Sequence, residues 1–375
     1  MTKTIIRTFF PLAALLASCS PSVAGDRPTV TETKGVFAVT PLATLDAPWA
    51  IAVLPHGGVL VTEKAGSLKL IDGAVKDVAG VPKVDAGGQG GLGDVVLAPD
   101  YAKSGLVYLS WVEAGENDTR GAAVGRARLV LGEAPRLEGL EVLWRQNPKV
   151  TGRGHFSHRI AFSPDGQLMF VASGERQKMD PAQDLSVNLG KVLRLLPDGN
   201  PAPGNPFADK GGVSAEIWTY GHRNILGLAF DPQGRLWDLE HGPAGGDELN
   251  LVEPGKNYGW PIVSEGDHYD GRDIPPHSTR PDMAAPNLSW TPVIAPGDMV
   301  FYRGKAFRDW RGQLLIGGLV SKGLVRVSIN GTKVIGEARY PLDKRIRDVA
   351  EAHDGSLLVI EDGKGGRLLK LTPAK

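Results

Sequence analysis

Short apolar segments recur along the chain, and each is followed by a polar turn and a second apolar segment. Six copies begin at Ile51, Val95, Ile160, Leu226, Met299 and Val349. The copy IAFSPDGQLMFVASGE, from Ile160, shows the pattern most clearly: β-branched and aromatic residues alternate around a turn that contains Gly. This is the signature of a β-hairpin. No window of about 11 residues keeps a period of 3.6, so helices are expected to be few and short.

The copies start 44, 65, 66, 73 and 50 residues apart. A β-sandwich also contains hairpins, but it does not repeat turns of the Pro-Asp-Gly type at such intervals. A β-propeller does, because it repeats one four-stranded blade around a central channel. The sequence therefore predicts an all-β fold: one six-bladed β-propeller over residues 35–375, with four antiparallel strands in each blade. The long gaps 178–188 and 264–290 are expected to be loops, where a rigid scaffold carries its functional site.

The first 18 residues predict an export signal of the lipoprotein type. Lys3 and Arg7 precede an apolar stretch that is too short to span a bilayer. The tetrapeptide Leu-Ala-Ser-Cys that ends at Cys19 resembles the bacterial lipobox, so Cys19 is expected to be lipidated and to attach the protein to a membrane. Ordinary cleavage after Ala24 is the alternative. Residues 19–34 are expected to be a tether, and the protein is expected in the periplasm, anchored to the outer membrane.

Composition excludes several classes of partner and site. The chain has 42 basic and 42 acidic residues, so it lacks the basic excess that nucleic-acid binding requires. It has one cysteine, which excludes a disulfide scaffold and a thiolate metal cage. Any metal must therefore be held by oxygen or nitrogen ligands.

Histidine, arginine and glycine cluster where the hairpins begin. His155 lies just before the third copy, and Glu175, at the end of the following strand, could hold its imidazole as a general base. Arginines near strand starts could clamp a polyanionic ligand or could guard a solvated sheet edge; these are Arg159, Arg223, Arg345 and Arg347. The glycine-rich run 87–94 lacks the Lys-Ser/Thr ending of a phosphate-binding loop, and is expected instead to let the backbone approach a flat ligand.

A longer motif carries a family resemblance. The series YGHRN from Tyr220, GLAF from Gly227, Gly-Pro at 242–243, Asp-Glu at 247–248 and NYGWP from Asn257 resembles the soluble quinoprotein glucose dehydrogenases and the PQQ-dependent aldose sugar dehydrogenases. The resemblance covers roughly 42–372. It implies oxidation of an aldose sugar at C1 to the lactone, with pyrroloquinoline quinone (PQQ) and Ca²⁺ as cofactors. A histidine would be the base, hydride would pass to the quinone, and an external electron acceptor would complete the reaction.

The resemblance also implies a role for each matching residue. His155 resembles the family's general base, Glu175 the carboxylate behind it, and Arg223 a residue at the reactive quinone carbonyl. The residues implied in cofactor binding are Arg159, Arg223, Asn224, Lys322, Arg345 and Arg347. Gln89 and His241 are implied near the sugar. The carbonyls of Gly242 and Pro243 are implied as ligands of a PQQ-bound Ca²⁺, and Glu248 with the carbonyl of Tyr258 as ligands of a structural Ca²⁺.

The chain departs from the glucose-type members at three places. Gly154 stands where they have Asp, His241 stands where they have Gln, and Ser321 aligns with their cofactor lysine, with Lys322 one position away. These changes resemble the aldose-dehydrogenase branch. Two alternatives from other functional classes stay open: a Ca²⁺-dependent lactonase-type propeller, and a non-catalytic binding propeller at the cell surface.

Overall fold

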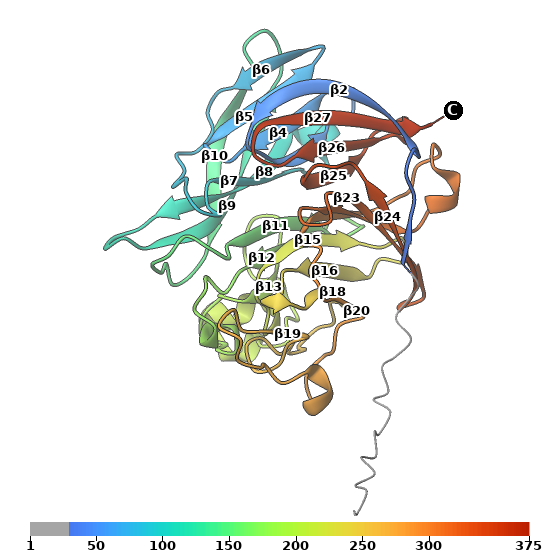
Figure 1. Cartoon of the computed structure of the whole chain (residues 1–375). Coiled ribbons are helices and arrows are strands. Elements are labelled where there is room, and N and C mark those ends of the chain that lie inside the picture. The colour runs from blue at the N-terminus through green and yellow to red at the C-terminus, as the bar shows by residue number, and fades with distance from the viewer. Residues whose placement is uncertain (1–29, 375) are drawn as a thin grey trace, which may run out of the picture.

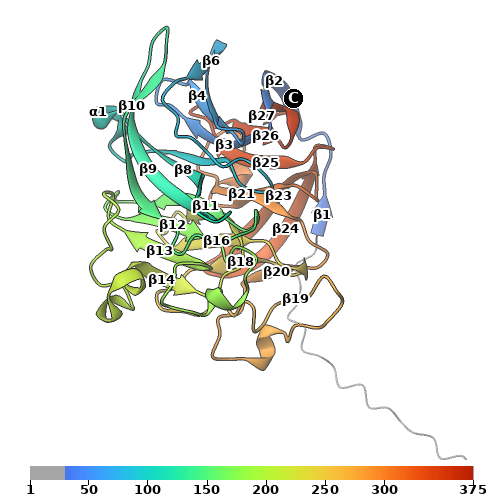
Figure 2. The ribbon, with the colours of Figure 1, turned by 90° about the vertical axis from the view of Figure 1, so that its left-hand side faces the viewer.

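Six blades, each built on four antiparallel strands, surround a common axis in the computed structural model, which describes residues 30–374 (Figures 1 and 2). The expected export signal at 1–18, Cys19 and the first part of the expected tether lie outside the described residues. The prediction of an all-β, six-bladed propeller with four antiparallel strands per blade is confirmed. The innermost strands of successive blades are β3 (Pro48–Val53), β7 (Leu92–Leu97), β11 (Ser157–Phe162), β15 (Ile225–Phe230), β21 (Pro296–Phe301) and β25 (Ile346–Glu351).

All six predicted hairpins begin in these innermost strands. In the third hairpin the turn ends at Gly166, whose φ of 72° lies in the left-handed region that glycine adopts without steric cost. The strands next to the innermost ones are β4 (Val59–Glu63), β8 (Leu106–Ala114), β12 (Met169–Ser173), β16 (Leu236–Glu240), β22 (Leu314–Gly318) and β26 (Leu357–Glu361). The outer strands are β5 (Ser67–Asp72), β6 (Ala74–Val78), β9 (Arg120–Val130), β10 (Arg136–Arg145), β13 (Lys191–Leu195), β14 (Ile217–Tyr220), β18 (Asp247–Leu251), β20 (Leu288–Trp290), β23 (Gly323–Asn330), β24 (Lys333–Pro341), β27 (Lys364–Pro373) and β2 (Phe37–Asp46).

The ring closes through the beginning of the propeller chain. Strand β2 forms the outer edge of the sixth blade by antiparallel pairing with β27, the last strand of the chain. The innermost strands pack against one another all the way round, and β25 packs against β3. A short strand, β1 (Val30–Glu32), lies within the segment expected to be a tether and pairs in parallel with β24 of the fifth blade.

The core is divided among the blade interfaces. Among the described residues, six of the seven apolar clusters each join two neighbouring blades. The cluster that joins the sixth blade to the first contains Leu45 of β2 with Val61 and Leu368. Each blade therefore buries its two apolar faces, one against each neighbouring blade. A ring with a blade missing would leave such faces exposed to solvent.

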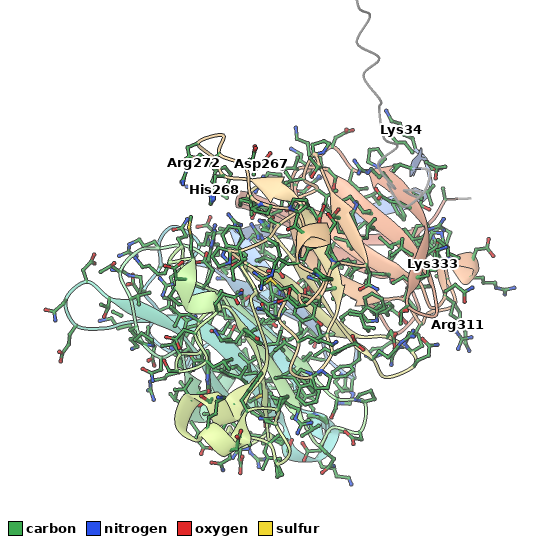
Figure 3. The ribbon with its side chains drawn as sticks, turned by 90° about the horizontal axis from the view of Figure 1, so that it is seen from below. Lys34, Asp267, His268, Arg272, Arg311 and Lys333 are labelled. Carbon is green, nitrogen blue, oxygen red and sulfur yellow. The ribbon has the colours of Figure 1, made fainter. Side chains whose placement is uncertain are left out.

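Helices are few and short, as predicted. The described chain has one α-helical turn, α1 (Tyr101–Ser104), and short 3₁₀ turns at Asp180–Ala182, Ala208–Lys210, Gly212–Glu216, His277–Thr279 and Arg308–Trp310. Over residues 30–374, no helix has the length and apolar character that a membrane crossing needs. The connection from β18 to β20 leaves the fourth blade and includes a two-stranded pair, β17 (Ala244–Gly245) with β19 (Gly266–Asp267); its tip stands out from the body of the molecule in Figure 3.

The closure by β2 leads to a stability prediction. Leu45 is 4% exposed, whereas Val39 on the same strand is 46% exposed. We expect Leu45→Ala to lower the free energy of unfolding by about 2–5 kcal/mol, because it leaves a cavity at the closing interface. Val39→Ala should change it by about 0.5 kcal/mol or less. Urea unfolding of the two variants checks this, and equal effects would show that β2 does not close the core.

Candidate active site

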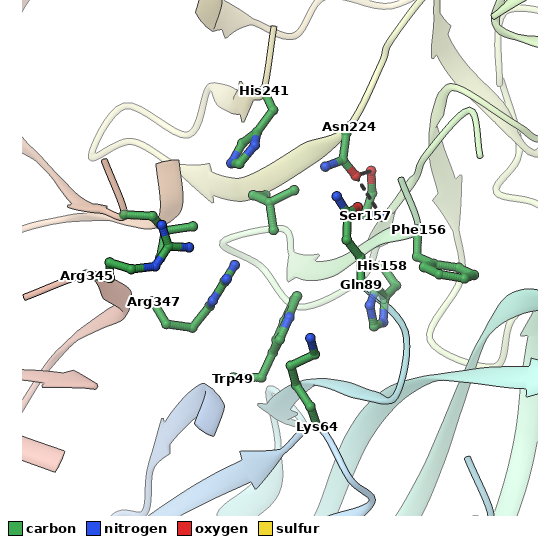
Figure 4. Close-up of a pocket in the computed structure, with 12 residues that line it drawn as sticks. Trp49, Lys64, Gln89, Phe156, Ser157, His158, Asn224, His241, Arg345 and Arg347 are labelled. Atoms are coloured by element: carbon green, nitrogen blue, oxygen red, sulfur yellow. Dashed lines mark hydrogen bonds between the residues drawn. The ribbon is translucent and has the colours of Figure 1, made fainter. Parts of the chain in front are cut away.

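A cavity of about 220 Å³ opens where the innermost strands begin (Figure 4). Its wall comes from at least four blades, because it includes Trp49 of β3, His158 of β11, Leu226 of β15 and Arg347 of β25. Since these residues stand at or near the first residues of their strands, the cavity lies at one mouth of the central channel. The segments that begin the third and fourth hairpins, with His158 and Asn224, both line it.

The cavity is positively charged on one side. Lys64, Arg345 and Arg347 line it, and Figure 4 shows their side chains pointing into the same hollow. Asp362 pairs with both arginines, accepting from Nε of Arg345 at 2.9 Å and from Nε of Arg347 at 3.0 Å. Burial, and then the charge of Arg347, lower the pKa of Lys64. Three cationic side chains against one carboxylate leave an excess of positive charge for an anionic ligand.

A histidine–carboxylate pair lies next to residues of this cavity, because His155 directly precedes Phe156, which lines it. Nδ1 of His155 is hydrogen-bonded to Oε1 of Glu175, and both side chains are buried. Oε2 of Glu175 accepts from the backbone N–H groups of Lys178 at 2.5 Å and Met179 at 2.6 Å. Because both oxygens of the Glu175 carboxylate accept hydrogen bonds, the ring proton of a neutral His155 must sit on Nδ1. Its Nε2 then carries the lone pair that a general base requires.

The charges of the pair suit the same role. Burial lowers the pKa of His155 by more than the hydrogen bond to Glu175 raises it, and the charge of Arg223 lowers it further. Burial alone would raise the pKa of Glu175, but the hydrogen bond with His155 brings it below its ordinary value. At neutral pH the pair is therefore a neutral imidazole held by a carboxylate.

Two loops with unusual backbone hold this pair. Of the twelve non-glycine residues with positive φ in the described chain, six lie in these loops: His155, Ser157, His158, Arg176, Gln177 and Met179. Such conformations cost energy and persist only where the surrounding structure imposes them. Here the imposed backbone places His155 between Glu175 and Gln89. This concentration of unfavourable φ values could not be read from residue types.

Other predicted site residues converge on the same mouth. Gln89 accepts a hydrogen bond from the backbone N–H of His155 at 2.7 Å, and Gln89, Asn224 and His241 all line the cavity. Arg223 donates to the carbonyl of His241 at 2.9 Å, while its buried Nε has no hydrogen-bond partner. Burial lowers the pKa of His241 to about 3, so this imidazole is neutral.

A second cleft adjoins the first through His241. It is lined by Gly242 and Pro243, by Arg223 and Trp260, and by Glu248 and Tyr258. The backbone N–H of Gly242 donates to Asp247 at 2.9 Å, which fixes the turn that carries the Gly-Pro carbonyls. The residues that the resemblance implied as two sets of metal ligands thus share one cleft.

Buried carboxylates gather behind this cleft. Nδ2 of Asn250 lies 3.1 Å from Asp238, 3.3 Å from Glu240 and 3.5 Å from Glu248. Burial raises the pKa of Asp238 to about 7, and burial together with the charge of Glu240 raises that of Glu248 well above its ordinary value. Oδ2 of Asp238 and Oδ1 of Asn250 are buried without a hydrogen-bond partner. Such a set of oxygen atoms suits a hard cation.

The structure does not place Arg159 in the ligand cavity. Its guanidinium lies 4.0 Å from the ring of Trp49, and it lines a separate cavity of about 300 Å³ further along the channel. It lies 3.2 Å from Asp94 and 3.5 Å from each of Asp298 and Asp348, and it donates to the carbonyls of Leu226 at 2.7 Å and Gly297 at 2.9 Å. These partners belong to the five other blades.

The comparisons with known proteins agree with this geometry. The sequence model of the glucose/sorbosone dehydrogenase family matches residues 45–370. The chain belongs to this family. The protein is therefore an oxidoreductase. The family resemblance that the series from Tyr220 to Pro261 carries is confirmed.

Individual relatives cover almost the whole chain. The aldose sugar dehydrogenase YliI of Escherichia coli is 41% identical over 340 residues, which are 88% of this chain and 91% of that protein. A crystal structure of the Escherichia coli soluble aldose sugar dehydrogenase in the apo-form is 40% identical with a TM-score of 0.83, over 90% of this chain and 99% of that one. The structure of the PQQ-bound aldose sugar dehydrogenase of Streptomyces coelicolor is 29% identical with a TM-score of 0.74. The match covers 90% of this chain and 98% of that one.

Two details differ from the sequence-based expectations, and a third concerns Gly154. Lys322 is exposed and lies in a shallow depression beside Lys344, outside the cavity, whereas Lys64, which the sequence analysis did not select, points into it. The glycine run admits protein rather than ligand: a Cβ at Gly91 would lie 2.0 Å from the carbonyl of Lys64, and one at Gly93 would lie 2.0 Å from His158. Beside Gly154, the Gln177 amide fills the space a side chain would need, with Cδ 2.5 Å from a Cβ position.

The contacts of Arg159 lead to a prediction for this family member. Arg159→Met leaves the buried Asp94 and Asp348 and the half-buried Asp298 without their cation, and should lower the free energy of unfolding by about 3–5 kcal/mol. Burial raises the pKa of Asp94, and that of Asp298 well above its ordinary value, although Arg159 opposes both shifts. The folded variant therefore binds more protons than its unfolded chain above about pH 4, so its stability falls as pH rises. Denaturation should show a larger loss at pH 8 than at pH 5, while the exposed control Arg272→Met changes little.

Proposed function

We propose that this protein oxidises aldose sugars at C1 to the lactone, with PQQ and Ca²⁺ as cofactors and His155 as the general base. The observation that carries the proposal is the His155–Glu175 pair beside a cavity with an excess of cationic side chains. The names of the relatives support the substrate class and the quinone cofactor. A lactonase-type site would need carboxylates, not cations, around the ligand, and a simple binding propeller would not need a buried base.

The cavity residues fit PQQ. This cofactor is a flat tricarboxylate, so it requires cations and an aromatic or apolar wall. Arg345, Arg347 and Lys64 would bind its carboxylates, and Trp49, Leu226 and Leu319 would supply the flat wall. Lys64, rather than Lys322, is then the lysine of the cofactor site. Arg223 and Asn224, at the other side, would meet the quinone end.

The second cleft fits calcium. The carbonyls of Gly242 and Pro243 would hold the ion that accompanies the quinone, and Glu248 with the carbonyl of Tyr258 would hold a structural ion. Two observations support this proposal: Oδ2 of Asp238 and Oδ1 of Asn250 have no hydrogen-bond partner, and burial raises the pKa values of Asp238 and Glu248. A hard cation would stabilise these carboxylates in their charged form.

The mechanism assigns one task to each group. PQQ with its Ca²⁺, when bound, supplies the electrophilic quinone that takes up hydride from C1. Nε2 of His155 accepts the proton of the C1 hydroxyl, because Glu175 keeps the other proton on Nδ1. Gln89 fixes the backbone of the base, and Arg223 presents a cation beside it. An external electron acceptor then completes the cycle.

The location is proposed from residues 1–19 alone. An export signal followed by a lipidated Cys19 would attach the propeller to the outer membrane from the periplasmic side.

Reconstitution tests the function. The protein titrated with PQQ in the presence of Ca²⁺ should bind the cofactor, and addition of an aldose should then reduce the quinone, as measured by its absorbance. Arg347→Met and Lys64→Met should each weaken PQQ binding by about tenfold or more, because each removes a charge-assisted contact to a carboxylate. Lys322→Met is the matched control and should bind PQQ as the parent does. Absence of sugar-dependent reduction in PQQ-loaded protein would overturn the proposal.

Glu175→Gln separates the base from its support. One oxygen becomes an NH₂ group, which faces an N–H donor in either orientation: Nδ1–H of His155, or the backbone amides of Lys178 and Met179. The imidazole then loses its fixed tautomer, and kcat should fall roughly 10²-fold with PQQ affinity unchanged. Because Glu175 raises the pKa of His155, its loss should move the acid limb of kcat/KM to lower pH. An unshifted limb with full activity would remove Glu175 from the mechanism.

A further inference from the structure

A second buried guanidinium lies behind the base. Arg176 follows Glu175 directly in the chain; it is fully buried and lines neither the cavity nor the second cleft. Its four hydrogen bonds all go to neutral oxygens: the carbonyls of Arg120 at 2.6 Å, Gly152 at 2.7 Å and Gly154 at 2.9 Å, and the side-chain oxygen of Gln146 at 3.4 Å. A cation is costly to bury among neutral acceptors. An apolar residue would occupy this position at lower cost, unless the charge and its hydrogen bonds serve the site.

The contacts of Arg176 surround the base in the chain. Its Nε donates to the carbonyl of Gly154, just before His155, and its guanidinium carbon lies 3.7 Å from the ring centre of Phe156, just after it. The backbone N–H of Arg176 donates to the carbonyl of His155 itself at 3.2 Å. Because Phe156 lines the cavity (Figure 4), the guanidinium supports the cavity wall from behind as well as the backbone of the base.

The same guanidinium fixes the loop of the base to the neighbouring blade. Its Nη1 donates to the carbonyl of Arg120, the first residue of β9 in the second blade, and its Nη2 donates to Gly152. His155 has a φ of 48°, which the backbone keeps only where its surroundings impose it. A guanidinium suits this task, because its planar N–H groups point in fixed directions to several acceptors at once.

The charge of Arg176 also acts on the imidazole. Burial and the charge of Arg120 lower the pKa of Arg176 to about 10, so the guanidinium is charged at neutral pH. Burial lowers the pKa of His155 most, and the hydrogen bond and charge of Glu175 raise it. Arg223 and Arg176 both lower it further. The two arginines therefore oppose the carboxylate that would otherwise hold a proton on the base.

The two arginines differ in their access to a ligand. Arg223 lines the second cleft, so a ligand in that cleft changes the field that Arg223 exerts. His241, which also acts on the site, is neutral because burial lowers its pKa to about 3. Arg176 has no exposed surface, and charges buried in protein are screened much less than exposed ones. Its charge therefore acts on His155 before and after a ligand binds.

We propose that Arg176 is a positioning residue of the base: its guanidinium fixes the backbone on both sides of His155, and its buried charge opposes protonation of the imidazole. A general base must be unprotonated when the substrate arrives and must lie within hydrogen-bond reach of the proton that it takes. Arg176 contributes to both conditions without touching the substrate. The inference rests on the proposed function, since it assigns a support to the proposed base.

Two substitutions separate the charge from the hydrogen bonds. Arg176→Met removes both, so His155 should take up its proton at higher pH than in the parent, and kcat should fall about tenfold because the base is less well placed. Arg176→Lys keeps the charge but loses the planar fork. In this variant His155 should titrate as in the parent, while kcat falls as in Arg176→Met.

Two measurements check these expectations. An NMR titration of the histidine ring protons follows His155 in the full chain without PQQ, with its signal assigned by its absence in His155→Gln. The pH profile of kcat/KM for glucose follows the base in the PQQ- and Ca²⁺-loaded enzyme. In Arg176→Met the acid limb of this profile should move to higher pH, the opposite direction from Glu175→Gln. A PQQ titration of each variant shows whether cofactor loading is equal.

Lys191→Met is the matched control. Lys191 is a fully buried cation on β13 of the same blade, and its ammonium also donates only to carbonyls: those of Leu189 at 2.6 Å, Pro181 at 2.8 Å and Ala182 at 3.1 Å. It is not among the charges that shift the pKa of His155. Its removal should lower the stability of the protein, as that of Arg176 does, but should leave the titration of His155 unchanged.

Each outcome decides the proposal. If His155 titrates alike in the parent and in Arg176→Met, or shifts equally in Lys191→Met, the charge of Arg176 has no specific effect on the base and the proposal is overturned. Parent kcat in both Arg176 variants overturns the positioning role. If Arg176→Met does not fold, Arg176→Gln takes its place, because its amide still donates to a carbonyl. If the loaded parent oxidises no aldose, the proposed function fails, while the NMR titration still decides whether Arg176 acts on His155.

Discussion

A single buried guanidinium touches every blade of this propeller. Arg159 extends from the innermost strand of the third blade and meets Trp49, Asp94, Leu226, Gly297 and Asp348 of the other five. A propeller has no other central element, because its core is divided among the blade interfaces. The charge network therefore sets the distances between innermost strands, and every group at the channel mouth depends on those distances.

This constraint also separates two functions along one channel. Above Trp49 the cavity has an excess of cations, with Lys64, Arg345 and Arg347 facing one carboxylate. Below Trp49, Arg159 faces three aspartates. The sequence places Arg159 and Arg347 alike, each near the start of an innermost strand. Only the ring geometry decides that Arg347 faces a cavity while Arg159 faces protein.

The fold was readable from sequence because it repeats. The hairpin pattern at Ile51 or Ile160 is local: alternation and a turn glycine suffice to predict it. The pairing of β2 with β27 was not readable, because no local signal marks a strand that completes a distant blade.

Within the site, His155 and Glu175 could be predicted from their positions in a repeat. Lys64 was not selected, because it looks like an ordinary lysine at the end of a hairpin; the antiparallel pairing of β3 with β4 returns it to the start of β3, beside Trp49 at the mouth. Gly91 and Gly93 were misread for the same reason: their close neighbours, Lys64 and His158, are distant in sequence.

The closing strand has a consequence for the order of events during synthesis. The hydroxyl of Thr372 in β27 donates a hydrogen bond to the carbonyl of Ala38 in β2, 334 residues earlier in the chain. Strand β2 therefore stays unpaired during synthesis until β27 has been made. Contacts of such long range form late and slowly. Lys64 and Arg347 stand on either side of that seam, in the first and sixth blades. The cationic half of the cavity therefore exists only in the finished ring, and an incomplete chain lacks it.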